Sequence, residues 1–330
     1  MEQSKETIQK RKEEYKERKE LRQKRINEGG KAPELDNLKH NKIMCKVLYY
    51  PLRLMRKVNK IELTTDKKVR EDKKRQSALA SMEEIVLPKD RPIIIAPNHS
   101  RKEDIELILE AVPLHMFILS GDYENVHGDI GGAMLEQNGV VYFDMFDKED
   151  RKNVKWVIDQ MLSNNVNLLW FYEGSWNLSP NKILEDGYTH IIQAAIDNNA
   201  LVLPVSFDMY GKNAYVNVGA PIDYRAIYGD RKLTKEEKIE GLELLKEKIA
   251  TGLYDIWSKH SFDSKENIPE DYWEKRNEEI LDAWYFDADL IESKHFKNPN
   301  KVSTDEAFKH LNDIEVSKNS AFLLSKRNHH

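Results

Sequence analysis

Residues 92–104 have the sequence PIIIAPNHSRKED, the most informative segment of this chain. The three consecutive isoleucines, Ile93 to Ile95, are typical of a strand that is buried on both faces of a parallel sheet. Pro97 and Asn98 end the apolar run, so the strand places His99 at its carboxyl end. Open α/β sheets bind their ligands at that end, which makes His99 a candidate site residue.

Asp104 follows shortly after His99, where a helical pattern begins. On one continuous helix the two side chains would point about 140° apart. Contact between them therefore requires His99 in the loop and Asp104 in the first turn of the helix. A carboxylate that orients an imidazole in this way prepares it to take a proton from a hydroxyl. The spacing alone also fits an exposed loop histidine followed by an aspartate that complements the helix dipole.

Apolar runs alternate with helical patterns from residue 78 to about residue 220. The alternation predicts strands at 92–96, 115–119, 140–143, 167–172, 201–207 and 214–218. It predicts helices at 103–112, 128–137, 148–163 and 184–198, and a further amphipathic helix follows at 234–258. The predicted fold class is α/β, a mostly parallel sheet flanked by helices, with an N-terminal amphipathic helical arm and a C-terminal helical extension. Pro204 inside one strand predicts an edge strand or a bulge.

The 330-residue chain has a formal net charge of −5, which is unevenly distributed. Residues 1–75 hold 24 Lys and Arg against 13 Asp and Glu, a net charge of +11, so the remainder carries −16. A basic arm on an acidic body predicts docking to an anionic surface, either lipid headgroups or nucleic acid. Aromatic residues are not interleaved with the basic residues of the first helix, so nucleic acid is not an expected partner.

Cysteine content and hydropathy indicate the compartment. Cys45 is the only cysteine, which rules out a disulfide framework and indicates a reducing environment. No apolar run reaches the roughly 18 residues of a membrane-spanning helix, and the N-terminus is charged throughout. The sequence therefore predicts a cytoplasmic protein that lies peripherally on the inner face of the membrane.

Residues 40–60 are the predicted membrane-docking element. Their apolar stripe, with Tyr49 and Tyr50 beside it and basic residues opposite, is typical of a helix lying among lipid headgroups. The same pattern fits a helix that packs on its own catalytic domain and leaves its lysines in water. Pro51 is expected to kink this helix or to start a second one.

Three further segments with polar residues lie at the ends of predicted strands. They are GVVYFD at 139–144, FYEGS at 171–175 and LPV at 203–205. Together with Asn98, His99 and Asp104, these segments resemble the four ordered sequence blocks of the glycerolipid acyltransferase family. The best-known members of that family are the 1-acylglycerol-3-phosphate acyltransferases. The resemblance covers residues 78–225.

The resemblance implies an O-acyltransferase. His99 would take the proton from an acceptor hydroxyl as its oxygen attacks an acyl thioester, and Asp104 would orient the imidazole. Neither residue would become acylated, in keeping with the absence of a G-x-S-x-G motif from the sequence. Backbone N–H groups around Gly174, or at the helix start after His99, are candidates for holding the thioester oxyanion. The predicted substrate-binding residues are Asn98, Arg101, Glu173, Gly174, Ser175 and Trp176.

Two departures from the family pattern bear on the acceptor. Met145 and Trp176 stand where the second and third blocks of the family have arginines, so two phosphate-binding cations are missing. Trp176 either packs in the core or forms a platform for a sugar ring or a lipid chain. Four other cations either restore positive charge at the mouth of the pocket or are solvated residues at helix starts; they are Arg101, Lys102, Lys148 and Arg151.

The predicted substrates are an acyl thioester donor, acyl-CoA or acyl carrier protein, and a lysophospholipid or other hydroxyl acceptor. No cofactor and no metal ion are predicted, since the histidines lack the spacing of metal ligands. Two alternatives stay open: an acyltransferase for a glycan or a polyol phosphate, and a catalytically silent scaffold at the membrane surface. The intact His99–Asp104 pair argues against the scaffold.

Four segments are predicted along the chain. Residues 1–35 form a charged helical arm, and the solvated helix within it ends at Gly29 and Gly30. Residues 36–77 form the basic amphipathic membrane-docking segment, with a polar linker at 64–77. Residues 78–260 form the acyltransferase domain, and residues 261–330 form a helical C-terminal extension.

Overall fold

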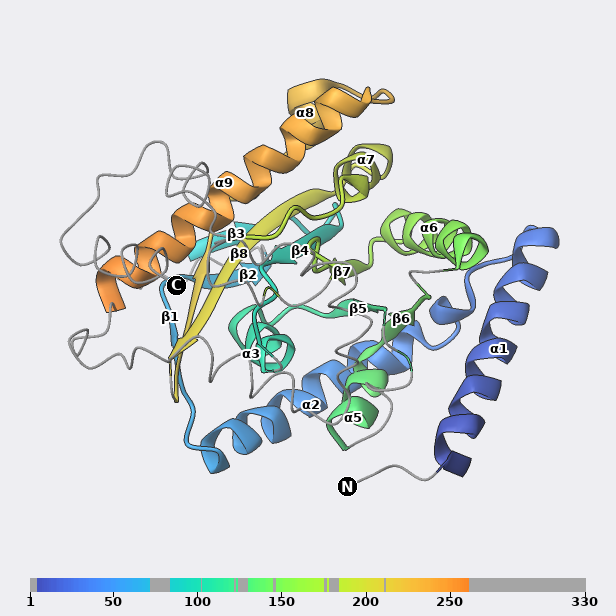
Figure 1. Cartoon of the computed structure of the whole chain (residues 1–330), viewed down its shortest axis with the longest axis horizontal. Coiled ribbons are helices and arrows are strands. Elements are labelled where there is room, and N and C mark those ends of the chain that lie inside the picture. Colours follow the sequence, from blue (N-terminus) through green and yellow to red (C-terminus); the bar gives the residue numbers. More distant parts are fainter. Residues whose placement is uncertain are drawn as a thin grey trace.

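A seven-stranded sheet lies at the centre of the computed structural model (Figure 1). The model describes residues 5–71, 84–101, 103–121, 123, 130–144, 147–174, 177, 184–210 and 212–260. The strands of this sheet, in spatial order, are β1 (Glu62–Thr65), β9 (Asn213–Val218), β8 (Leu201–Tyr210), β4 (Ile93–Pro97), β7 (Asn167–Leu169), β5 (Met116–Ser120) and β6 (Val140–Tyr142). A separate parallel pair consists of β2 (Lys68–Glu71) and β3 (Glu84–Leu87). The helices are α1 (Lys5–Asn27), the short 3-10 helix η1 (Pro33–Leu35), α2 (Leu38–Val58), α3 (Asp104–Ala111), α5 (Ile130–Asn138), α6 (Lys148–Ser163), α7 (His190–Asp197), α8 (Tyr224–Tyr228) and α9 (Lys235–His260).

The strand pairing confirms the predicted fold class, an α/β fold with a mostly parallel sheet flanked by helices. Neighbouring strands are parallel throughout the seven-stranded sheet except for β8 and β9, which are antiparallel. Each strand predicted between residues 92 and 218, and each helix predicted between residues 103 and 258, has a counterpart. The largest difference is α7, which begins at His190 rather than at residue 184. The predicted extension at 261–330 lies outside the described residues.

Two apolar layers enclose the sheet, and β4 contributes to both of them. Ile94 and Ala96 pack with residues of α6, α7 and α9 on one face. Ile93 and Ile95 pack with residues of α3 on the other face, to which α5 adds Leu135. All five residues of β4 are buried, as the isoleucine run predicted. This central strand is therefore a rigid support for the loop that follows it.

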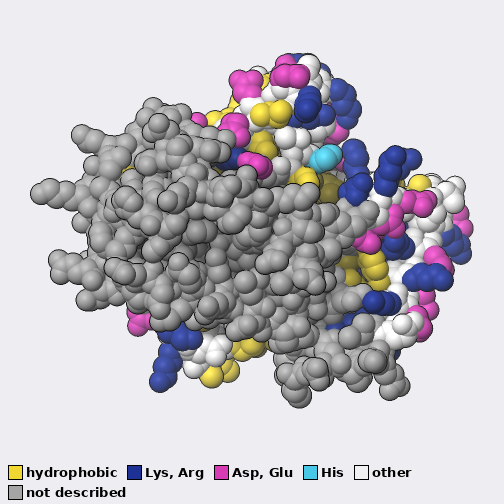
Figure 2. Space-filling view, viewed as in Figure 1, with side chains coloured by type: hydrophobic (Ala, Val, Ile, Leu, Met, Phe, Trp, Pro, Cys, Tyr) yellow, Lys and Arg dark blue, Asp and Glu magenta, His cyan; other side chains and the backbone are white. Residues whose placement is uncertain are grey.

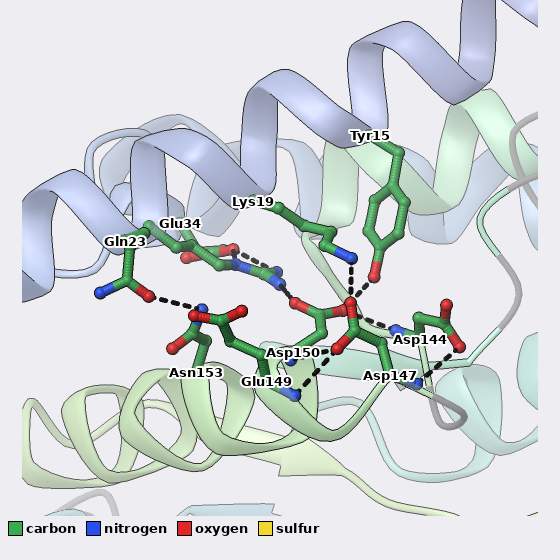
Figure 3. A network of polar contacts seen from close by, with 10 residues as sticks. Tyr15, Lys19, Gln23, Glu34, Asp144, Asp147, Glu149, Asp150 and Asn153 are labelled. Atoms are coloured by element: carbon green, nitrogen blue, oxygen red, sulfur yellow. Dashed lines mark hydrogen bonds and ion pairs between the residues drawn. The ribbon is translucent and has the colours of Figure 1, made fainter.

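The helix α1 packs against the start of α6 through polar side chains (Figure 3). Tyr15 donates a hydrogen bond to Asp150, and Lys19 Nζ lies 2.5 Å from Asp147 Oδ2. The Asp147 side chain also accepts hydrogen bonds from the backbone N–H groups of Glu149 and Asp150, and so caps α6. Lys19 therefore pairs with the residue that caps the N-terminus of α6.

Arg22 is the most deeply buried cation of α1. Its side chain is fully buried, with Nη2 2.5 Å from Glu34 Oε1 and Nη1 3.6 Å from Asp150 Oδ1. The prediction of a solvated arm is wrong for this face of the helix, because carboxylates of other elements replace water around Arg22. Other side chains of α1 form a charged surface of interspersed Lys, Arg and Glu (Figure 2).

Two other predictions about the chain are corrected by the sheet, and one of the two alternatives for Pro51 is excluded. The prediction of a polar linker at 64–77 is wrong in part, because residues of this segment belong to the strands β1 and β2. Pro204 lies in β8, an interior strand rather than an edge strand. It is tolerated because antiparallel pairing with β9 begins at the next residue, while the Pro204 carbonyl accepts a hydrogen bond from the Gly219 N–H at 2.9 Å. Pro51 lies inside a single helix, α2, and starts no second one.

Candidate active site

His99 and Asp104 contact each other at the carboxyl end of β4. His99 Nδ1 lies 2.7 Å from Asp104 Oδ2. The histidine is in the loop and the aspartate is the first residue of α3, as their contact requires. The Asp104 side chain is fully buried, whereas 17% of the His99 side chain is exposed. A buried carboxylate thus orients an imidazole that remains accessible from outside.

Asp104 also holds the backbone of the loop. Its Oδ2 accepts hydrogen bonds from the N–H groups of Ser100 at 3.2 Å and Arg101 at 3.4 Å. A carboxylate accepts but cannot donate, so the proton between the side chains lies on His99 Nδ1. The other ring nitrogen, Nε2, then carries the lone pair, and His99 has the tautomer of a general base.

Asn98 fixes the same loop to β8. Its side-chain Nδ2 donates to the Phe207 carbonyl at 2.9 Å, and its Oδ1 accepts from the Phe207 N–H at 2.7 Å. Both groups are buried, and the paired bonds clamp the end of β4 onto the neighbouring strand. The structure therefore gives Asn98, predicted to bind substrate, a contact with the backbone of β8.

Glu173 supports His99 from the loop after β7. Its Oε1 accepts a hydrogen bond from the His99 backbone N–H at 2.8 Å, and its Oε2 accepts one from the Glu185 N–H at 2.7 Å. Burial raises the pKa of Glu173 to about 8, although the two backbone hydrogen bonds and Lys246 act in the opposite direction. Glu173 thus connects its own loop after β7 with the loop after β4 and with the segment that contains Glu185.

Two aromatic residues define the surroundings of this loop. The ring of Phe171 lies 4.0 Å from the His99 ring, centroid to centroid, at an interplanar angle of 32°. Gly174 has a φ of +78°, and a Cβ there would meet the Tyr188 ring at 2.4 Å. Glycine is therefore required at this turn for both its conformation and its size.

The topology accounts for the location of the pair. β4 and β7 are neighbours, and the helices that follow them lie on opposite faces of the sheet, α3 on one and α7 on the other. Ligands of open α/β sheets bind at such a reversal, outside the carboxyl ends of the strands. His99 follows β4 and Glu173 follows β7, so both residues lie at this position.

The predicted oxyanion donors have hydrogen-bond partners within the protein. The Gly174 N–H donates to the Phe171 carbonyl at 3.1 Å, and the Ser100 and Arg101 N–H groups donate to Asp104. These groups are already engaged within the protein. An oxyanion would have to displace these contacts, and the assignment of the oxyanion donors stays a prediction.

The predicted cations divide into two groups. Arg101 is buried, with 8% of the residue exposed, so it is not a solvated residue at a helix start. Lys148 and Arg151 are exposed in the first turn of α6, as the solvated alternative expected. The remaining predicted positions, which lie outside the described residues, are Lys102, Met145, Ser175 and Trp176.

Sequence patterns did not predict several partners of the loop. Phe207 and Glu185 act through backbone groups, which carry no signal in the sequence. Asn177 also contributes its backbone, whose N–H donates to the His99 carbonyl at 2.6 Å. Phe171 belongs to a recognised segment, but its ring contact with His99 depends on how β4 and β7 pair. Within the described part of the chain, no group of three or more His, Cys, Asp or Glu side chains is arranged to hold a metal ion.

Comparison with known proteins gives few matches. No family model matches the chain, and no curated protein matches it. Among solved structures, the 1-acyl-sn-glycerophosphate (LPA) acyltransferase PlsC from Thermotoga maritima matches with 18% sequence identity and a TM-score of 0.41. The match covers 66% of this chain and 79% of that one.

Proposed function

We propose that this protein is an O-acyltransferase that moves a fatty acyl group from acyl-CoA or acyl carrier protein to a hydroxyl of a lysophospholipid-type acceptor. The observation that carries the proposal is the contact of His99 Nδ1 with the buried carboxylate of Asp104 at the end of β4. The resemblance of the surrounding segments to the glycerolipid acyltransferase blocks supports the same reaction.

In the proposed reaction His99 is the general base. Its Nε2 takes the proton of the acceptor hydroxyl while that oxygen bonds to the carbonyl carbon of the thioester. Asp104 stabilises the positive charge that the imidazole then carries. When the carbon–sulfur bond breaks, the proton passes from His99 to the departing thiolate. The products are an ester and a free thiol, and no acyl-enzyme forms.

Glu173 and Asn98 are positioning residues in this proposal. Glu173 accepts a hydrogen bond from the His99 backbone N–H, and the neighbouring residue Asn98 bonds to the backbone of Phe207. A general base must lie within hydrogen-bond reach of the proton that it removes, so a shift of the loop would lower the rate. Their removal is expected to lower kcat more than it raises the KM for the donor.

Thiol release tests the reaction directly. The purified protein is incubated with an acyl-CoA and a thiol reagent, and candidate acceptors are added in turn. The proposal expects release that depends on a lysophospholipid and disappears in His99→Ala. A matched control is His190→Ala, which removes a histidine at the start of α7. Release with a glycan or polyol phosphate alone would select the alternative acceptor, and the absence of release with every acyl donor would contradict the enzyme.

We also propose that α2 attaches the protein to an anionic membrane surface. Five large apolar residues recur along one side of α2, each more than half exposed, at Ile43, Val47, Tyr50, Leu54 and Val58. The helix contains no Asp or Glu and includes six Lys and Arg residues. Among the described residues, no helix is long and apolar enough to cross a membrane. Figure 2 shows hydrophobic and basic side chains next to each other where α2 ends.

Vesicle binding tests this attachment. The paired change Tyr50→Ser and Leu54→Ser should weaken binding to vesicles that contain phosphatidylglycerol by tenfold or more, since each apolar side chain contributes about 1.5–3 kcal/mol when fully buried. Binding should fall as salt rises. The matched control pair, Ile227→Ser and Ile239→Ser, removes exposed apolar side chains of α8 and α9. Equal binding to purely neutral vesicles would contradict the proposal.

A further inference from the structure

Lys246 is a buried lysine in the middle of α9. Its side chain is only 2% exposed, and it lies on the buried stripe of the helix that also includes Leu242, Ile249 and Leu253. The stem of a surface lysine can cover apolar residues while its ammonium group stays in water, but a side chain buried this deeply has no such exit. The ammonium group is therefore inside the protein, where an unbalanced charge is costly.

The ion pair of Lys246 with Glu243 accounts for its burial only in part. Lys246 Nζ lies 3.5 Å from Glu243 Oε1, and 41% of the Glu243 side chain is exposed. Water screens an exposed carboxylate, so a pair of this kind contributes little to stability. Lys246 also acts on the buried carboxylate of Glu173. Burial raises the pKa of Glu173 to about 8 and Glu185 acts in the same direction, whereas Lys246 lowers it.

Tyr172 connects α9 with the loop that contains Glu173. It directly precedes Glu173, is fully buried, and belongs to the same apolar cluster as the core residues of α9. Burial and the carboxylates of Glu173, Glu243 and Glu185 all raise the pKa of Tyr172. Charged groups of α9 and of the loop after β7 therefore lie close enough to influence each other.

The hydrogen bonds of Glu173 are those of an ionised carboxylate. Each of its oxygens accepts a backbone N–H, from His99 at 2.8 Å and from Glu185 at 2.7 Å. A protonated acid carries a hydrogen on one oxygen, which would then face a donor. A nearby cation favours the ionised form because it offsets part of the cost of burying the charge. Lys246 is such a cation.

We propose that Lys246 is a positioning residue, whose ammonium group balances the charge of Glu173 so that Glu173 holds the backbone of His99. This inference rests on the proposed acyl transfer, and it extends the site to α9, beyond the residues 78–225 that resemble the acyltransferase blocks. In this role Lys246 acts through Glu173 and the His99 N–H.

The proposal gives kcat a defined dependence on pH. Because Glu173 has a pKa of about 8, kcat should increase as the pH rises from about 7 to about 9, where the carboxylate becomes ionised. Lys246→Met removes the cation and should move this increase upward by about one pH unit. An unchanged pH profile would overturn the proposal. Other titratable groups face Glu173 or its neighbours and stay the same in this comparison; they are His99, Tyr172, Glu185 and Glu243.

A double-mutant cycle separates this role from a structural one. At about pH 8, Lys246→Met should lower kcat about 10-fold and leave the KM for acyl-CoA nearly unchanged, because the loop shifts while the substrate contacts remain. The same change should have no further effect on kcat in a protein that already carries Glu173→Gln. Multiplying losses would overturn the proposal, since Lys246 would then act independently of Glu173. The matched control is Lys248→Met, which removes an exposed lysine of the same helix.

Amide hydrogen exchange tests the contact without acyl transfer. At about pH 8 the His99 N–H should exchange faster in Lys246→Met than in the wild type or in Lys248→Met. Unchanged exchange in an active enzyme would overturn the role of Lys246 alone. Faster exchange in a protein that transfers no acyl group would support that role and refute the proposed function.

The folding of Lys246→Met provides a last check. At about pH 6 Glu173 keeps its proton, so the variant should fold there and have a Tm no lower than that of the wild type. A variant that fails to fold at this pH would overturn the proposal, because Lys246 would then have a structural partner other than Glu173.

Discussion

Replacing Asp104 by asparagine should remove most of the proposed activity while leaving the fold intact. Oδ2 of Asp104 accepts hydrogen bonds from His99 and from the backbone of Ser100 and Arg101, whereas Oδ1 has no hydrogen-bond partner. An asparagine amide oxygen can take the place of Oδ2 and keep all three bonds. Its amide nitrogen then takes the place of Oδ1. The main loss is the negative charge that faces the imidazole.

The size of the effect follows from the distance. Charges on an imidazolium and a carboxylate in contact lie about 4 Å apart and interact by about 4 kcal/mol at an effective dielectric constant of about 20. Since about 1.36 kcal/mol corresponds to a tenfold change in rate, kcat should fall about 10³-fold. The free energy of unfolding should change by less than about 1 kcal/mol, because no hydrogen bond is lost.

The assay combines acyl transfer with urea unfolding of Asp104→Asn and Asp104→Ala. The alanine variant leaves three donors without an acceptor, of which the N–H groups of Ser100 and Arg101 are buried. It should be destabilised by about 2–6 kcal/mol, because each unmatched buried donor costs about 1–3 kcal/mol. An asparagine variant that folds normally and retains more than a tenth of the wild-type kcat would refute the reasoning. The carboxylate would then contribute less than about 1.4 kcal/mol to the transition state.

Three further predictions concern pH, the N-terminal helix and packing. Because burial raises the pKa of Glu173 to about 8, the folded state keeps a proton that the unfolded state releases above about 4.5. The free energy of unfolding, measured in urea, should therefore fall as the pH rises from about 4.5 to about 8. Glu173→Gln should make this pH dependence less steep. Arg22→Met leaves two buried carboxylates without their cation and should lower the free energy of unfolding in urea by about 3–5 kcal/mol. The double variant, Arg22→Met with Asp150→Asn, should lower it by less. Equal decreases in the two variants would mean that Arg22 and Asp150 are not coupled. A Cβ at Gly252 would lie 2.2 Å from Ser206 Oγ. Gly252→Ala should therefore reduce the free energy of unfolding by about 1–3 kcal/mol and lower the Tm. An unchanged Tm would show that α9 and β8 are not tightly packed at this position.

Contacts between residues that are close in the sequence could be predicted without the structure. His99 and Asp104 belong to one strand–loop–helix unit, and the loop between them leaves little choice of geometry once the strand and the helix form. The isoleucines before them indicate burial on both faces because a parallel sheet is covered by helices on both sides. The fold class and the central pair of the candidate site therefore followed from local patterns.

Contacts between distant segments could not be predicted in this way. Glu173 reaches the backbone of His99 because β7 pairs with β4, and no local pattern records which strands become neighbours. The prediction that Pro204 marks an edge strand or bulge shows the same limit, since the position of β8 in the sheet depends on pairing with β4 and β9. These pairings are set by the packing of whole layers, whose free energy is spread over many residues.

The sequence by itself determined the order of strands and helices along the chain and the local pairing of an imidazole with a carboxylate. Only the tertiary structure decided which charges are buried. Arg22 and Arg101 look alike in the sequence, as basic residues in polar surroundings, yet one lies between two carboxylates and the other has none among the described residues. The physical reason is that the cost of burying a charge depends on partners brought together by folding, and these partners are distant in the chain.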